Sequence, residues 1–204
     1  PLEEALACDV VTLHVPLTRG GPDPTWHMAD RSLFECMQRG AVFFNSSRGP
    51  VVAEEDLKQA ILSGRLGAVA LDVWEGEPAI DPSMIEMVDI ATPHIAGHSL
   101  DGKAAGTQMI YEAACRFLGV AATQDARRYL PPPLVPRLKV TGPGAAQEIV
   151  RRTVCRIYDV MADDARLRQI ARVPAEKRGE FFDDLRRNYP CLLYTSPSPR
   201  DRTR

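Results

Sequence analysis

Apolar residues form three nearly continuous β-branched runs in the first half of the chain, and a weaker run follows them. The three runs span residues 9–13, 41–44 and 68–71, and the weaker one spans 88–91. Because apolar residues follow one another without polar alternation, each run predicts a strand buried on both faces of a parallel sheet.

Helix signals separate these runs. Asp30 can cap a helix that ends near Gln38, and residues 54–63 predict a second helix. A longer helix is expected after Ser99, ending near Leu118. Strands that alternate with helices of this length predict an α/β fold, a doubly wound parallel sheet with helices on both faces.

The pattern changes after residue 120. Residues 121–136 include three consecutive prolines and predict a stiff linker. Residues 137–190 predict a smaller α+β domain, with a strand at 137–141 and helices at 146–161 and 175–188.

The final segment, residues 191–204, breaks the preceding pattern. It is similar to a translated sequencing-library adapter, and the alternative is a disordered tail rich in Pro, Ser and Arg. On either interpretation we expect this tail to lie outside the fold, so the domain predicted for residues 1–120 and the domain at 137–190 carry the structure.

Composition and charge narrow the class of protein. A formal net charge of −2, with acidic and basic residues mixed along the chain, argues against nucleic-acid binding. Five scattered cysteines, with no Cys-x-x-Cys pair, favour reduced thiols in the cytoplasm over disulfides or a metal site. No apolar stretch approaches the roughly 18 residues that a membrane span needs.

Polar or ionisable residues follow all four predicted strands. They occupy residues 14–17, 45–50, 72–78 and 93–98. Since ligands of open parallel sheets bind outside the carboxyl ends of the strands, these four loops predict a common site.

An arginine, a glutamate and a histidine at such a site indicate oxidation of a hydroxy acid. Histidine can take and return a proton near neutral pH, a carboxylate can fix its tautomer, and a guanidinium can bind a substrate carboxylate through two hydrogen bonds. Each of these residues alone would be interpreted as structural or solvated. Their occurrence at successive strand ends favours catalysis.

Three strings carry a family resemblance: Asn-Ser-Ser-Arg-Gly at 45–49, Asp-Val-Trp-Glu-Gly-Glu-Pro at 72–78, and Thr-Pro-His-Ile-Ala-Gly at 92–97. They resemble the later signatures of the D-2-hydroxyacid dehydrogenases. The resemblance implies that Arg48 binds the substrate carboxylate, that His94 is the acid/base and that Glu77 is its partner. Glu75 is the competing candidate for the partner role.

The same resemblance implies a Rossmann-like domain that uses NAD, with no metal. It places six residues at the cofactor: Val15, Ser46, Ser47, Arg48, Asp72 and Gly97. His14 and His27 are interpreted as structural.

Longer strings around 48–52, 72–78 and 94–103 resemble the branch of this family that acts on 4-phosphoerythronate in vitamin B6 biosynthesis. Residues 157–168 are similar to the C-terminal dimerisation domain of that branch, which implies a homodimer. The implied reaction is NAD-dependent oxidation of 4-phospho-D-erythronate, a small phosphorylated hydroxy acid, to 2-oxo-3-hydroxy-4-phosphobutanoate.

Two departures from that branch affect the predictions. Position 98 is His where the branch has a tyrosine, and we hypothesise that His98, beside the helix start at Ser99, contacts the substrate phosphate. The sequence contains no Gly-x-Gly-x-x-Gly turn, so NAD and NADP both stay open and the 204 residues alone are expected to be weakly active or inactive.

Three other functions stay open. The protein could oxidise another D-2-hydroxy acid, such as glycerate or phosphoglycerate. It could be a non-enzymatic NAD-binding protein similar to the corepressors that share this fold, or it could serve only as a dimerisation module.

Overall fold

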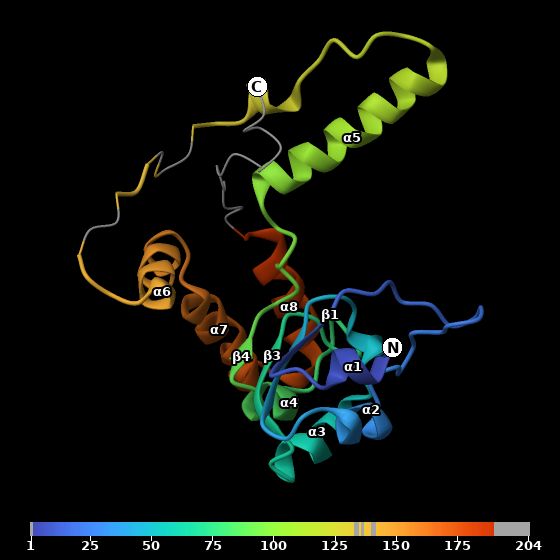
Figure 1. The fold of residues 1–204 in the computed structure, drawn as a ribbon, viewed down its shortest axis with the longest axis vertical. Coiled ribbons are helices and arrows are strands. Elements are labelled where there is room, and N and C mark those ends of the chain that lie inside the picture. The colour runs from blue at the N-terminus through green and yellow to red at the C-terminus, as the bar shows by residue number, and fades with distance from the viewer. Residues whose placement is uncertain (1, 133–134, 136, 140–141, 190–204) are drawn as a thin grey trace. The chain divides into compact units, whose positions relative to one another are not determined.

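The computed structural model describes residues 2–132, 135, 137–139 and 142–189 (Figure 1). The chain divides into two compact units. Of the described residues, the first unit combines 2–96 with 159–188, and the second contains those within 97–158 together with Tyr189.

The first unit contains a parallel sheet in which the strands lie in chain order: β1 (Val10–Leu13), β2 (Ala41–Asn45), β3 (Leu66–Leu71) and β4 (Ile90–Ala91). The register aligns Val11 with Phe43 and Phe43 with Val69. The four strands lie at the predicted positions, and the α/β fold is confirmed.

A short helix, α1 (Leu2–Leu6), precedes the first strand. The strands are connected by α2 (Arg31–Cys36), the 3-10 turn η1 (Gly49–Val51), α3 (Glu54–Leu62) and α4 (Pro82–Met87). Asp30 caps α2 as predicted, because its carboxylate accepts a hydrogen bond from the backbone N of Leu33 (3.1 Å). This helix ends at Cys36 rather than at Gln38. The predicted end of the next helix is confirmed, since Gly64 follows α3 in a left-handed conformation (φ 63°).

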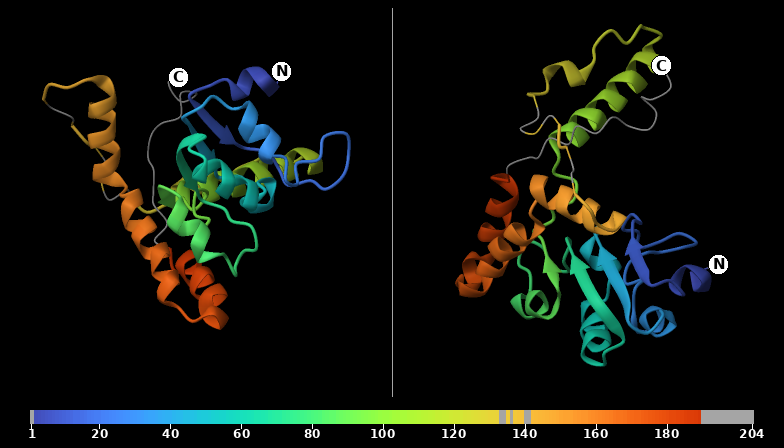
Figure 2. Two further views of the ribbon diagram at one scale, coloured as in Figure 1. Left: turned by 90° about the horizontal axis from the view of Figure 1, so that it is seen from below. Right: turned by 60° about the vertical axis from the view of Figure 1, so that its left-hand side comes forward.

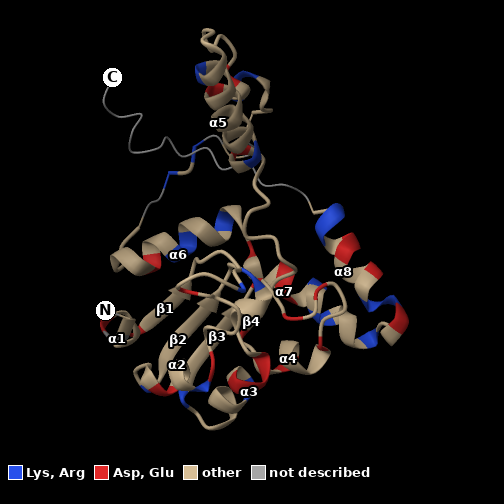
Figure 3. Ribbon diagram, turned by 90° about the vertical axis from the view of Figure 1, so that its right-hand side faces the viewer, with Lys and Arg blue, Asp and Glu red and all other residues tan. Residues whose placement is uncertain are grey.

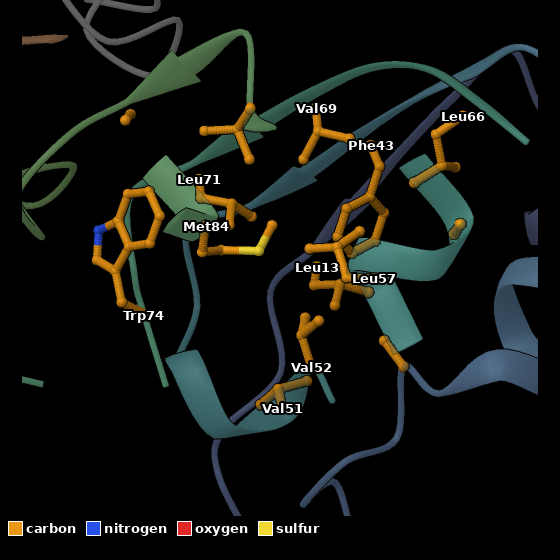
Figure 4. Packing of buried hydrophobic residues seen from close by; sticks show 14 of the residues in the cluster. Leu13, Phe43, Val51, Val52, Leu57, Leu66, Val69, Leu71, Trp74 and Met84 are labelled. Atoms are coloured by element: carbon orange, nitrogen blue, oxygen red, sulfur yellow. The ribbon is translucent and has the colours of Figure 1, made fainter. Parts of the chain in front are cut away.

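The core lies on one face of the sheet, under α2, α3 and α4. Phe43 and Leu13 from the strands pack near Leu57 of α3, and Met84 of α4 lies below Leu71 (Figure 4). On the other face, Val10 is 53% exposed and Phe44 is 37% exposed. The prediction that the strands are buried on both faces is therefore wrong for this unit, because its inter-strand helices cover one side.

The helices near the end of the described chain belong to the first unit. They are α7 (Val160–Arg168), the 3-10 turns η3 (Gln169–Arg172) and η4 (Ala175–Lys177), and α8 (Arg178–Arg187), and they lie beside β4 (Figure 2). Leu167, Ile170 and Phe182 have no exposed surface and join the same core as the strands.

A polar contact attaches α7 to the edge of the sheet. Asp164 accepts a hydrogen bond from the backbone N of Ala91 (2.8 Å), which occupies a donor at the sheet edge. Arg168 pairs with Asp164 (2.7 Å) and donates to the carbonyls of Ile85 and Val88. The edge strand is thus closed by a segment far along the chain.

The second unit contains α5 (Leu100–Leu118), the 3-10 turn η2 (Ala126–Tyr129) and α6 (Ala146–Ile157). The predicted cap of α5 is confirmed, because Ser99 Oγ accepts from the backbone N of Gly102 (3.1 Å). The helix predicted over 146–161 ends at Ile157, since Asp159 starts a new helix by accepting from the backbone N of Met161 (3.1 Å).

The strand predicted at 137–141 is not found where it can be checked. Residues 137–139 have no regular structure, and 140–141 lie outside the described residues. A strand needs a neighbour to satisfy its backbone groups, and the described part of the second unit contains no other strand. The predicted tail at 191–204 also lies outside the described residues.

Charged residues of both signs are interspersed over the helices. Figure 3 shows that α8 carries Arg side chains at both ends and Asp and Glu side chains between them. Within the described ranges, no helix combines the length and the apolar character that a membrane span requires. In the same ranges, no group of His, Cys, Asp and Glu side chains is arranged to hold a metal ion.

Candidate active site

The His94 and Glu77 side chains are in hydrogen-bond contact beyond the carboxyl ends of β3 and β4. Glu77 Oε2 lies 2.7 Å from His94 Nδ1, and both side chains are largely but not fully buried, at 19% and 26% exposed. The other carboxylate oxygen of Glu77 accepts from the backbone N of Trp74 (2.8 Å). An Nδ1–H bonded to this carboxylate leaves Nε2 of the neutral imidazole as the proton acceptor.

Asp72 organises the loop that carries His94. Its carboxylate accepts from the Thr92 hydroxyl (2.6 Å) and from the backbone N of Ile95 (2.8 Å) and of Ala96 (2.9 Å). Its carbonyl accepts from the backbone N of His94 (2.6 Å). Asp72 is 7% exposed, so these bonds fix the loop from a buried position. Its predicted contact with the cofactor stays a prediction.

The loop that carries Arg48 is held by Asn45, the last residue of β2. The Asn45 amide oxygen accepts from the backbone N (3.0 Å) and the hydroxyl (2.8 Å) of Ser47, and its NH₂ donates to the Arg48 carbonyl (3.0 Å). The Arg48 side chain is exposed, and its Nη1 donates to the Ser47 carbonyl (2.6 Å).

Gly49 brings this loop against the loop that carries Glu77. A Cβ built on Gly49 would lie 1.8 Å from the carbonyl oxygen of Trp74, so only glycine permits the approach. The structure therefore packs the Arg48 loop on the Glu77 loop, although Arg48 itself is not bonded to the His94–Glu77 pair.

Glu75 contacts a different histidine. Its Oε1 lies 2.6 Å from Nε2 of His27, and its backbone N donates to Glu54 Oε1 (2.6 Å). Of the two glutamates that competed for His94, Glu77 is the one in contact. Burial raises the pKa of Glu54 to about 7; the hydrogen bond from the Glu75 N–H opposes this rise, and the Glu75 charge adds to it.

The other predicted site residues are distributed as follows. Ser46 lies half-buried in the Arg48 loop, and Val15 is half-buried against the core. His14 is exposed and its Nε2 lies 3.0 Å from Thr12 Oγ1. Gly97 and His98 belong to the second unit, where the His98 ring lies edge-on to Tyr189 (6.2 Å between centroids). Their roles at the cofactor and the substrate phosphate stay predictions.

Three residues of the site were not singled out from the sequence. Asn45 and Thr92 hold the Arg48 and His94 loops, and Glu54 holds Glu75. The position of Asn45 at a strand end was a usable signal, because a short amide there can bond its own following loop. The contact of Glu54 crosses between separate segments and leaves no local pattern.

Comparison with known proteins places the first part of the chain in a family. Residues 1–96 match the family described as D-isomer specific 2-hydroxyacid dehydrogenase, NAD binding domain. Residues 1–96 therefore belong to this family, and the predicted family and its NAD cofactor are confirmed. Residues 129–191 match a domain described as of unknown function.

Individual relatives indicate a narrower class. The chain is 44% identical over 190 residues to erythronate-4-phosphate dehydrogenase from Marinobacter nauticus, which covers 93% of this chain and 50% of that protein. The protein of the same name from Escherichia coli O81 is 41% identical over 187 residues, or 92% of this chain and 48% of that one. The chain thus spans about half the length of the curated relatives it matches.

Among solved structures, a glyoxylate reductase from Paecilomyes thermophila superposes with a TM-score of 0.50 and 26% identity. The match covers 62% of this chain and 39% of that chain. It supports the same dehydrogenase fold.

The polar side chains at the strand ends are of the types that would fit beside the nicotinamide of NAD. Dinucleotides bind doubly wound sheets at the carboxyl ends of the strands, where the loops of Arg48, Glu77 and His94 lie. Ser46 and Arg48 would hold the cofactor in this domain. The side chains of Ser47 and Asp72 already form hydrogen bonds within the protein.

Proposed function

We propose that this chain carries the acid/base and carboxylate-binding part of an NAD-dependent dehydrogenase for 4-phospho-D-erythronate. The observation that carries the proposal is the 2.7 Å contact of His94 with Glu77, beside the loop of Arg48, inside a 2-hydroxyacid dehydrogenase domain. The names of the relatives, at 41–44% identity, support this substrate over other hydroxy acids.

The chemistry follows from the pair. Oxidation of a carbinol to a ketone removes a proton from the hydroxyl and a hydride from the carbon. His94 Nε2 takes the proton, because the Glu77 carboxylate holds the proton on Nδ1 and stabilises the imidazolium that forms. Bound NAD supplies the hydride acceptor.

Arg48 binds and orients the substrate. Its exposed guanidinium can form two parallel hydrogen bonds with the C1 carboxylate, which places the neighbouring C2 hydroxyl within reach of a base. The product of the proposed reaction is 2-oxo-3-hydroxy-4-phosphobutanoate. In this proposal, pyridoxal 5'-phosphate synthesis consumes it.

The test inserts this chain into the Marinobacter nauticus relative in place of the region that the chain matches, which is 50% of that protein. NADH formation is measured with 4-phospho-D-erythronate, D-glycerate and D-lactate. We expect turnover of the phosphorylated acid, and a loss of about 10²- to 10⁴-fold in kcat for His94→Ala. Glu86→Gln, an exposed carboxylate on α4, is the matched control and should keep full activity.

Two results would contradict the proposal in different ways. Equal or faster turnover of D-glycerate or D-lactate would support a dehydrogenase but contradict the proposal that 4-phospho-D-erythronate is its substrate. Absence of turnover, with NADH still bound and with the unmodified relative active in parallel, would favour a binding protein.

A further inference from the structure

His27 contacts both loops that carry the proposed catalytic side chains. Its backbone N donates to the carbonyl of Pro50 (2.8 Å), in the loop that carries Arg48. Its ring Nε2 lies 2.6 Å from Glu75 Oε1, in the loop that ends at Glu77. One residue outside the proposed catalytic set therefore bridges the guanidinium loop and the carboxylate loop.

Glu75 is held from its other side as well. Its backbone N donates to Glu54 Oε1 (2.6 Å), and its Oε2 accepts from the Glu54 backbone N (3.4 Å). The reciprocal bonds attach Glu75 to the start of α3. The side chains of His27 and Glu75 are 29% and 34% exposed, so their contact is partly shielded from water.

The backbone at His27 is in a conformation that side chains disfavour. Its φ is 51°, in the left-handed region, which costs a non-glycine residue about 1–2 kcal/mol. The ring stacks on Trp26 (3.7 Å between centroids), and the backbone N of Ala29 donates to the Val51 carbonyl (3.0 Å). Such conformations persist where the surroundings hold them, and they are frequent at functional sites.

We propose that His27 is a positioning residue that fixes the Arg48 loop and the Glu77 loop relative to each other through the Pro50 carbonyl and the Glu75 carboxylate. It does not touch the substrate in this scheme. The inference rests on the proposed function, because the two loops matter together only if Arg48 and the His94–Glu77 pair act on one molecule.

A positioning role and a purely structural role predict different kinetics. If the His27 ring only stabilised the fold, its loss would lower the amount of folded enzyme, and KM for the folded fraction would stay the same. If it positions the two loops, its loss raises KM through Arg48 and lowers kcat through Glu77.

Two substitutions isolate the ring from the backbone. His27→Ala and His27→Gln both keep the backbone N that donates to Pro50, and both place an unbranched side chain in the left-handed region. Only Gln retains an N–H donor that can reach Glu75. His14→Ala is the matched control, since that exposed histidine contacts Thr12 and neither catalytic loop.

The first measurement is backbone hydrogen exchange of the 204-residue chain. In His27→Ala we expect amides in 46–52 and 72–78 to exchange about tenfold faster, while those of α2 keep the wild-type rate. His27→Gln should restore most of the protection, and His14→Ala should match the wild type. Unchanged exchange in both loops of His27→Ala would overturn the proposal.

The second measurement is steady-state kinetics of the chimeric protein described above. We expect His27→Ala to raise KM for the hydroxy acid and lower kcat, each by about tenfold, with partial recovery in His27→Gln. Equal losses in the two variants, or a fall in kcat with KM unchanged, would overturn the proposal. A chimeric protein that carries the wild-type chain and shows no turnover would remove the proposed function, and the exchange measurement would still decide whether His27 ties the loops.

Discussion

Two histidines share an unusual combination of backbone and contact. Among the described residues, His27 and His94 are the non-glycine positions with φ in the left-handed region, at 51° and 54°. Each has a ring nitrogen within 2.7 Å of a glutamate from the loop after β3. The left-handed turn aims each ring at that loop, so the backbone strain is tied to the position of the carboxylates.

The burial of the Glu54 carboxyl makes the stability of the fold depend on pH. Burial raises the Glu54 pKa from its ordinary 4.5 to about 7. The folded chain therefore holds this proton more tightly than the unfolded chain. The resulting stabilisation is fully present below pH 4.5 and is lost as the pH rises through about 7.

We predict that Glu54→Gln removes this dependence. The amide oxygen can still accept from the Glu75 N–H, but it carries no charge to bury. At pH 8 the free energy of unfolding should exceed that of the wild type by about 1–2 kcal/mol, allowing for solvent screening. Below pH 4.5 the two should agree.

Urea unfolding at several pH values checks this, with Glu55→Gln as the control. Glu55 lies in the same turn of α3, and its side chain is 76% exposed. Between pH 6 and 8 the control should change with pH as the wild type does. If Glu54→Gln also follows the wild type, the Glu54 carboxyl does not titrate as described.

At the level of elements, α7 closes the sheet through one ion pair, of which the Asp164 carboxylate is buried and the Arg168 side chain is 32% exposed. Asp164 and Arg168 together satisfy the backbone N of Ala91 and the carbonyls of Ile85 and Val88. Because β4 leads directly to His94, the helix also fixes the strand from which the proposed acid/base residue departs.

We predict that Asp164→Ala lowers the free energy of unfolding by about 2–4 kcal/mol, because it leaves a buried N–H without an acceptor and a guanidinium without its carboxylate. Denaturant unfolding measures the change. Asp184→Ala breaks an exposed Asp–Arg pair on α8 and should cost about 0.5 kcal/mol or less. Equal losses in the two variants would show that the α7 contact contributes no more than a surface pair.

The sequence predicted the elements that local signals define. The four strands, the cap at Asp30 and the helix start at Ser99 lie where their patterns indicated. The break at Asp159 was missed because the apolar pattern continues through it, and the contact of Asp164 with Ala91 was missed because it joins distant segments. Burial of one sheet face depends on which elements pack there, which strand patterns alone do not report.

The sequence predicted some contacts of the site and missed others. The family resemblance, rather than residue spacing, distinguished Glu77 from Glu75, and the contact with His94 agrees with that choice. His27 was interpreted as structural, since no local pattern reports a left-handed backbone or a carboxylate from another loop. The dimerisation role predicted for residues 137–190 stays a prediction.

At the scale of the whole molecule, the first unit is built from two segments that are separated in the sequence. Residues 159–188 return to the unit formed by residues 1–96, after an intervening unit at 97–158. The returning helices contribute Leu167, Ile170 and Phe182 to the first core.

This return has a consequence for a molecule cut by a protease. Cleavage between residues 121 and 130, where Arg127 and Arg128 are exposed, would give two fragments whose buried contacts remain intact. We predict that trypsin-nicked protein elutes as one species from a size-exclusion column and separates only in denaturant. Elution of the fragments apart under native conditions would contradict the shared core. A nicked molecule would thus be two polypeptides on a denaturing gel and a single particle in solution.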